Sequence, residues 1–215
     1  MTVIRPLFTC MVLSFLHLRV AQAQDSAATS PNEVIEVTAT ALQKELSGRK
    51  EHFEDHPAEL YAVIDRVLLP SFDIQYAGKQ VLGKTHWIAS TDAQHERFIE
   101  VFYSFLIKTY AKGILEFDQD RMSIFPEPSY SKDRRKALVT TQLLLEGGDS
   151  VLIKYALRQT SANWKIYDVR IDGVSYIQNY RNQFDAEINA LGIDAVIDRL
   201  EKEALAPAGV TPAEA

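Results

Sequence analysis

The segment from Trp164 to Phe184 constrains the fold most, because it combines a strand, a tight turn and a helix with no linker between them. Side chains alternate along a strand, so Trp164 and Ile166 are expected on one face. Tyr167 and Val169 then fall on the other face. Because both sets are apolar, the strand is expected inside the protein and covered on both sides.

The residues after this strand predict a sharp turn into a helix. Asp172 and Gly173 break the strand. Ser175 with Gln178 three positions later is the pattern of a capping box, in which the hydroxyl accepts from a backbone N–H and the amide reaches back to the cap. An apolar stripe at helical spacing follows, and it consists of Ile177, Tyr180, Phe184 and Ile188. The helix is therefore expected to fold back onto the sheet.

The rest of the chain changes from a helical to a strand period near Met122. Helices are predicted at residues 32–46, 57–68, 74–82, where Gly83 provides a left-handed cap, and 92–115, which Thr91 and Gln94 open as a second capping box. Strands are predicted at 122–125, 137–145 and 151–157, with a hairpin turn at 147–149. Helices followed by a meander of strands predict an α+β domain with an antiparallel sheet.

The two ends of the chain differ from this domain in composition. Arg5, an apolar run and Ala21-Gln22-Ala23 predict a secretory signal peptide at residues 1–23, cleaved after Ala23. Its removal takes away Arg5, Arg19 and the only cysteine, Cys10, so the formal net charge changes from −6 to −8. Residues 24–31 are expected to be a disordered linker and residues 204–215 a disordered tail, which leaves 32–203 as the domain.

Motifs for catalysis and metal binding are absent from the sequence. There is no phosphate-binding glycine loop and no His-Glu-x-x-His, and the five histidines lack a ligand spacing. No catalytic residue, metal or cofactor is therefore predicted, and the net acidity argues against nucleic acid as a partner. Asp168, in the middle of a strand, could act as a general base in an apolar pocket. The favoured interpretation is a structural carboxylate that pairs with Arg181 or Arg170 or faces solvent at a sheet edge.

Apolar residues dominate the elements that are expected to face one another. On the long helix Phe98, Phe102, Leu106 and Tyr110 recur every four residues and form a stripe. The stripe is expected to face the strands that carry Val139 and Tyr155. A dry core and a ligand cavity require the same residues, so the pattern by itself leaves both possibilities open.

Three motifs resemble one family. The runs FDIQYAGKQVLGKTHWIAS from Phe72, QHERFIEVFYSFLIKTYAKGIL from Gln94 and YDVRIDGVSYIQNYRNQF from Tyr167 resemble the MlaC family of periplasmic phospholipid-binding proteins, also called toluene-tolerance proteins, over about residues 55–203. The resemblance implies an NTF2-like or cystatin-like curved antiparallel sheet packed against helices, with a small N-terminal helical part, around an apolar lipid pocket.

The resemblance also implies a function and a set of lipid-binding residues. The expected protein is a soluble periplasmic carrier, not an enzyme, that moves phospholipid between the outer and inner membranes and so maintains outer-membrane lipid asymmetry. Its expected partners are an inner-membrane Mla-type ABC transporter with an MCE-domain subunit and an outer-membrane Mla lipoprotein/porin complex. The residues expected to bind lipid are Phe98, Phe102, Leu106, Tyr110, Val139, Leu143, Val151, Ile153, Tyr155, Trp164, Val169 and Val174.

Two other functions remain compatible with the residues alone. One is a small-molecule isomerase or dehydratase on an NTF2-like scaffold, with Asp168 as its base. The other is an envelope scaffold protein whose apparent pocket is solid core.

Overall fold

The computed structural model describes residues 30–145 and 147–205. The predicted signal peptide, residues 24–29 of the predicted linker and residues 206–215 of the predicted tail lie outside the described residues. Within the described part of the chain, no helix is both long enough and apolar enough to cross a membrane.

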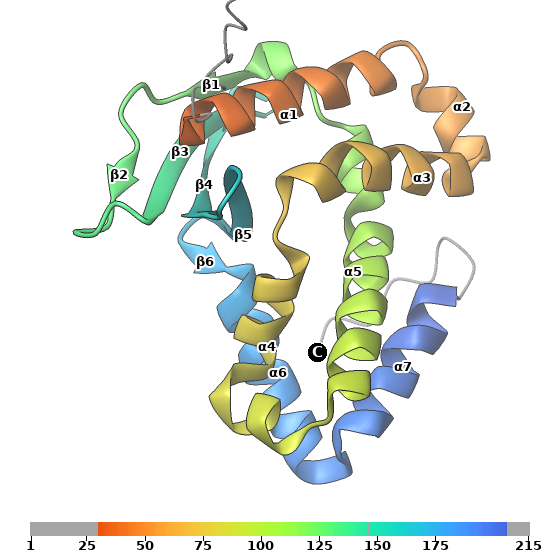
Figure 1. The fold of residues 1–215 in the computed structure, drawn as a ribbon. Helices are drawn as coiled ribbons and strands as arrows, with labels where there is room; N and C mark the ends of the chain where they lie inside the picture. Colours follow the sequence, from red (N-terminus) through yellow and green to blue (C-terminus); the bar gives the residue numbers. More distant parts are fainter. Residues whose placement is uncertain (1–29, 146, 206–215) are drawn as a thin grey trace, which may run out of the picture.

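The described chain is an α+β domain, as predicted, with helices on either side of a run of strands. The helices are α1 (Pro31–Leu46), α2 (Lys50–Asp55), α3 (Pro57–Leu68), α4 (Ile74–Ala89), α5 (Asp92–Leu115), α6 (Tyr176–Leu191) and α7 (Ile193–Leu205). In Figure 1 the sheet and α1–α3 form the upper part, while α4, α6 and α7 gather around the lower part of α5. Helix α5 therefore belongs to both parts.

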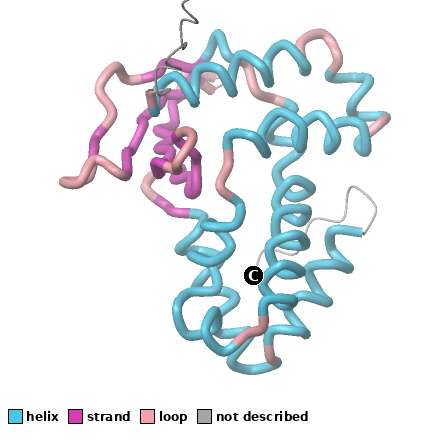
Figure 2. Tube along the Cα trace, in the orientation of Figure 1, coloured by secondary structure: helices cyan, strands magenta, loops and turns pink. Residues whose placement is uncertain are grey.

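The strands form one antiparallel sheet. They are β1 (Met122–Ile124), β2 (Ser129–Tyr130), β3 (Lys136–Leu144), β4 (Ser150–Gln159), β5 (Trp164–Ile171) and β6 (Val174–Ser175). Their order is β1-β3-β4-β5-β6, and the short β2 pairs with β3 beside β1. Figure 2 shows that all strands lie at one corner of a mainly helical molecule. The predicted meander is confirmed.

A β-bulge in β5 changes which side chains share a face. Leu157 of β4 pairs with Ile166. Two residues earlier on β4, Tyr155 pairs with Val169, which is three residues beyond Ile166. The extra residue, Tyr167, interrupts the alternation. Val169 therefore lies on the same face as Ile166, and the prediction that they face opposite sides is wrong because strict alternation requires a strand without a bulge.

Three apolar clusters hold the domain together. The lower cluster joins α4, α5, α6 and α7 around Phe98, Phe102 and Phe184. The upper cluster joins α1, α2, α3 and the end of α5, where Ala111 and Leu115 are buried. A third cluster packs α1 onto one face of the sheet. The two larger clusters thus meet different halves of α5.

Helix α4 contains a break at the position where the sequence predicts its end. Gly83 has φ +68°, which a glycine adopts without steric strain, and the helix resumes beyond it as far as Ala89. The carbonyl of Gln80 accepts a hydrogen bond of 2.6 Å from Arg181 Nε of α6. The predicted short helix is therefore the first half of a kinked longer one.

Candidate functional site: an apolar cavity between the sheet and the helices

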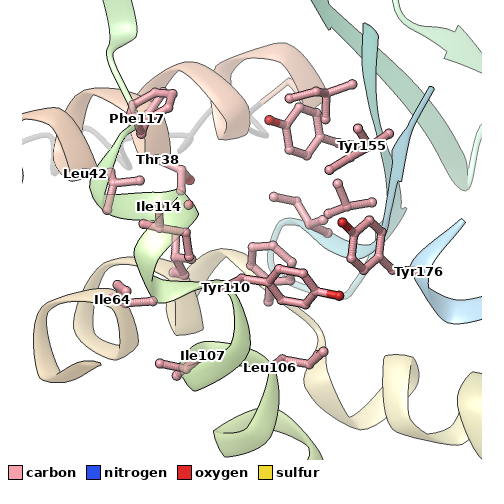
Figure 3. Close-up of a pocket in the computed structure, with 18 of the residues that line it drawn as sticks. Thr38, Leu42, Ile64, Leu106, Ile107, Tyr110, Ile114, Phe117, Tyr155 and Tyr176 are labelled. Atoms are coloured by element: carbon pink, nitrogen blue, oxygen red, sulfur yellow. The ribbon is translucent and has the colours of Figure 1, made fainter. Parts of the chain in front are cut away.

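A cavity of about 960 Å³ lies between the sheet and α1, α3, α5 and α6. Figure 3 shows its opposite walls, with Tyr155 and Tyr176 on one side and Ile114 and Phe117 on the other. Most of the side chains around it are aliphatic or aromatic. The cavity can therefore accept a large apolar ligand.

The sheet wall of the cavity is built from paired residues that share one face. Ile153 of β4 pairs with Ile171, and Tyr155 pairs with Val169. All four residues line the cavity. Each is half-buried, in contrast to Val139 further along the same face, which is 0 % exposed. The cavity is thus a continuation of the core face of the sheet.

The helical wall comes from the C-terminal half of α5. Leu106, Ile107, Tyr110 and Ile114 recur at helical spacing and all line the cavity. Leu106 also packs against the lower cluster, and Ile107 and Ile114 pack against the upper one. Gly113 also borders the cavity, and a Cβ built there would meet no atom within 4 Å.

The N-terminal helices complete the enclosure. Thr38 and Leu42 from α1 and Ile64 from α3 line the cavity with Phe117, which follows α5 (Figure 3). These residues were not among those predicted to bind lipid. The apolar stripes on residues 32–46 and 57–68 were the available signal. They predict that one face of each helix is buried, but they do not show whether that face contacts the core or a cavity.

Tyrosine hydroxyls are the main polar groups within the apolar walls. Tyr110 Oη and Tyr180 Oη lie 2.9 Å apart and share a hydrogen bond. Burial raises the pKa of both phenols, and the hydrogen bond between them raises that of Tyr110 further. Burial also raises the pKa of Tyr155 on the sheet wall. These groups therefore stay neutral at physiological pH.

Charged residues occur at one edge of the cavity. Lys50 Nζ of α2 donates to Glu116 Oε2 at 2.6 Å. Arg121, in the 3-10 turn η2 (Gln119–Arg121), donates through Nε to the carbonyl of Leu144 at 2.7 Å. Both cations line the cavity together with Asp118. This edge is the polar boundary of an otherwise apolar space.

The predicted lipid-binding residues divide into two groups in the structure. Seven of them line the cavity, namely Phe102, Leu106, Tyr110, Leu143, Ile153, Tyr155 and Val169. That they bind lipid stays a prediction.

The other five do not line it. Phe98, Val139 and Trp164 are buried in core clusters, Val151 lies outside the cavity, and Val174 is 60 % exposed. Their placement differs from the prediction because an apolar pattern marks burial without locating the empty space.

Asp168 is buried, and both of its carboxylate oxygens accept hydrogen bonds. Its Oδ2 accepts from Ser175 Oγ at 2.8 Å and lies 3.3 Å from Arg170 Nε, while Oδ1 accepts from the backbone N–H of Ile177 at 3.1 Å. The structure confirms Arg170 as its ionic partner, whereas Arg181 binds α4. The carboxylate therefore anchors the start of α6.

The predicted cap of α6 is half correct. Ser175 Oγ accepts from the backbone N–H of Gln178 at 3.1 Å, as expected. The Gln178 amide does not return to the cap but donates to Asn182 at 2.8 Å. Ser175 also belongs to β6, where it pairs with Arg170, and its hydroxyl donates to Asp168 of β5. The residue that caps α6 is therefore held by the sheet.

The histidines have separate surroundings. His86 Nε2 lies 2.7 Å from Asp185, and His52 Nε2 lies 2.8 Å from Glu59. His95 stacks on Trp87 with ring centroids 3.6 Å apart. In residues 30–145 and 147–205, no three His, Cys, Asp or Glu side chains are grouped to hold a metal ion.

Comparison with known proteins places these features in one family. The family described as MlaC protein matches residues 36–202. The toluene tolerance protein ttg2D of Pseudomonas putida is 27 % identical over 174 residues, which is 80 % of each chain. The intermembrane phospholipid transport system binding protein MlaC of Haemophilus influenzae is 24 % identical over 203 residues, covering 94 % of this chain and 92 % of the relative.

The fold agrees with that assignment. A phospholipid-binding protein from Ralstonia solanacearum, solved in complex with a phospholipid, superposes with a TM-score of 0.71 at 19 % identity, over 80 % of this chain and 96 % of that one. The structural likeness shows a shared fold, and the match over residues 36–202 shows the kinship. The chain belongs to the MlaC family.

Proposed function

We propose that this protein is a soluble periplasmic carrier that binds phospholipid and moves it between the outer and inner membranes. The single observation that carries the proposal is the apolar cavity of about 960 Å³, at the upper end of the range of about 300–1,000 Å³ for ligand pockets. Relatives named for phospholipid transport and phospholipid binding support phospholipid as the ligand.

A physical requirement for such a carrier follows from the acyl chains. Each methylene group transferred out of water contributes about 0.8 kcal/mol, so a chain of about sixteen carbons in water would cost on the order of 12 kcal/mol. A carrier has to cover the chains, whereas the headgroup can remain hydrated. An apolar cavity with most of its charged residues at one edge suits this division.

The proposed location and partners rest on the sequence and on the family. Cleavage after Ala23 would release a chain without cysteine into the periplasm. There the carrier would exchange lipid with an inner-membrane Mla-type ABC transporter through its MCE-domain subunit, and with an outer-membrane Mla lipoprotein/porin complex. This exchange would maintain outer-membrane lipid asymmetry.

Two observations count against the alternatives. An enzyme would need Asp168 to act as its base, but this carboxylate is ion-paired with Arg170 and accepts hydrogen bonds from Ser175 Oγ and from the backbone N–H of Ile177, which give it a structural role. A scaffold protein with a solid core would need no internal space of this size. The carrier therefore accounts for more of the structure than either rival.

Native mass spectrometry of protein purified without added lipid tests the proposal. A carrier is expected to retain the mass of a phospholipid. Protein that is folded and empty, and that does not take up phospholipid from vesicles, would favour the scaffold. Turnover of a small molecule that Asp168→Asn abolishes would favour the enzyme.

The proposed export is tested separately by the intact mass of the protein in periplasmic extract. The expected mature chain begins at Gln24. A chain that keeps residues 1–23, or that carries an acyl group, would contradict the predicted cleavage.

A further inference from the structure

Two tyrosine hydroxyls in the cavity wall hydrogen-bond to each other, and a hydrogen remains available for a further hydrogen bond. Tyr110 Oη and Tyr180 Oη lie 2.9 Å apart, and both residues line the cavity. The Tyr176 hydroxyl, also in the cavity wall, interacts with that of Tyr110 as well. Each hydroxyl carries one hydrogen, so two hydrogen bonds among three phenols still leave one hydrogen to donate. Across residues 30–145 and 147–205, no backbone carbonyl or carboxylate accepts a hydrogen bond from either hydroxyl.

Ring packing does not explain why these residues are tyrosines. The Tyr180 ring meets the rings of Phe102 and Phe105 edge to face, with centroids 5.2 and 5.8 Å apart. The Tyr110 ring meets that of Tyr176 in the same way at 5.1 Å. Such contacts depend on the rings, so phenylalanine would pack equally well. The hydroxyls therefore need a separate explanation.

The surroundings of the pair favour a neutral acceptor. Leu106 and Ile177 are the neighbouring wall residues on α5 and α6, and burial raises the pKa of both phenols, so the hydroxyls remain donors. The cations that line the cavity, Lys50 and Arg121, come from α2 and η2 instead. A phosphate bound at the hydroxyls would be a buried charge without a cation beside it.

A phospholipid carries a neutral acceptor where each acyl chain begins, namely the ester carbonyl. We propose that the Tyr110–Tyr180 pair donates a hydrogen bond to an ester carbonyl of the bound lipid. The cavity then distinguishes ester-linked phospholipids from ether-linked ones of the same headgroup and chain length. This inference rests on the proposed function, and it makes the pair a determinant of lipid specificity.

A competition between two lipids tests the proposal. The delipidated mature protein is offered equal amounts of dipalmitoyl phosphatidylethanolamine and its di-O-hexadecyl analogue, which differ in mass and only in the carbonyls. Native mass spectrometry then gives the ratio of the two bound lipids. One hydrogen bond is expected to enrich the ester lipid roughly 2- to 10-fold.

Two variants identify the donor. The double variant Tyr110→Phe/Tyr180→Phe keeps both rings and removes both hydroxyls, so the bound ratio is expected to fall to that of the mixture. Tyr130→Phe removes an exposed hydroxyl outside the cavity and is expected to keep the wild-type ratio. Should the double variant fail to fold, the wild-type ratio alone still decides whether an ester preference exists.

Each other result overturns the proposal in a recognisable way. Equal binding of the two lipids by the wild type would remove the ester preference. An unchanged ratio in the double variant with weaker binding of both lipids would identify the phosphate as the acceptor. Loss of preference in Tyr130→Phe would show that the ratio does not report on the hydroxyls of the cavity. Failure of the wild type to bind either lipid would contradict the carrier function itself.

Discussion

Ser175 Oγ donates a hydrogen bond of 2.8 Å to Asp168 Oδ2 across the turn that joins β5 to α6. The other carboxylate oxygen accepts from the backbone N–H of Ile177, so one buried side chain fixes the strand end to the first turn of the helix. Because α6 supplies Tyr176, Ile177 and Tyr180 to the cavity, this anchor also positions one of its walls.

Asp168→Asn is expected to destabilise the protein without emptying the cavity. An amide has one oxygen instead of two and places an NH2 group among donors, so the free energy of unfolding should fall by about 1–3 kcal/mol. Chemical denaturation measures the loss, and native mass spectrometry measures bound lipid. Asp172→Asn, an exposed change in the same turn at φ +49°, should have little effect, since asparagine tolerates this conformation. Loss of lipid at unchanged stability would contradict the structural role of Asp168.

Ile153→Glu should give folded protein that no longer binds lipid. The new carboxylate would enter the cavity, where it can be hydrated once lipid is absent, so the cost falls on the ligand and not on the core. Far-UV circular dichroism and lipid content are the measurements. Val151→Glu, two residues earlier on β4 and outside the cavity, is the control that should keep lipid.

Val139→Glu is expected to behave differently although it lies on the same face of the sheet. Its side chain is 0 % exposed and sits in the cluster beneath α1. An unpaired charge there should cost several kcal/mol and leave unfolded or insoluble protein. Soluble, folded Val139→Glu protein that lacks lipid would instead extend the cavity into this cluster.

Two glycine variants should change stability in opposite directions. A Cβ at Gly78 of α4 would lie 2.5 Å from Ile99 Cγ1 of α5, so Gly78→Ala should destabilise by about 1–3 kcal/mol. A Cβ at Gly113 would meet nothing within 4 Å, and Gly113→Ala should stabilise α5 by about 0.5–1 kcal/mol. Denaturation midpoints report both. In an Ile99→Ala background, which lacks Cγ1, Gly78→Ala should cost less than in the wild type, and no loss of stability in Gly78→Ala alone would refute the contact.

Alkaline pH should unfold the protein through its buried phenols. Tyr110, Tyr155 and Tyr180 have pKa values raised by burial above the ordinary 10.0, so the unfolded state releases these protons first. Their contribution to stability is complete below pH 10.0 and declines as the pH rises above it. Phenolate absorbance and circular dichroism should therefore change together in one transition. If all nine tyrosines ionised near pH 10.0 while circular dichroism still showed a folded protein, the burial of these three phenols would be contradicted.

The sequence predicts most of the elements because their boundaries carry local signals. Thr91 and Gln94 form the expected capping box of α5, and Pro57 begins α3. The strands of the hairpin follow the predicted alternation, since Val139 pairs with Tyr155 in an unbroken register. The patterns did not predict α2 or α7, because α2 is only six residues long and α7 follows a single glycine after α6.

The cavity was less predictable than the fold. Phe98 and Leu106 belong to one stripe on α5, yet Phe98 is 0 % exposed and Leu106 faces the space. The same hydrophobic period describes both, and only the arrangement of α1, α3 and the sheet separates them. Tyr167 is the clearest local cause of error, because the bulge there brings Val169 onto the face that Ile166 occupies.

The position of the cavity along the C-terminal half of α5 has a consequence for the release of a ligand. Phe98 and Val101 pack in one cluster, Ala111 and Leu115 pack in another, and none of these four residues lines the cavity. A ligand that leaves the cavity does not disrupt these contacts, so α5 stays packed against both clusters. The protein can therefore bind and release ligand repeatedly without partial unfolding of α5.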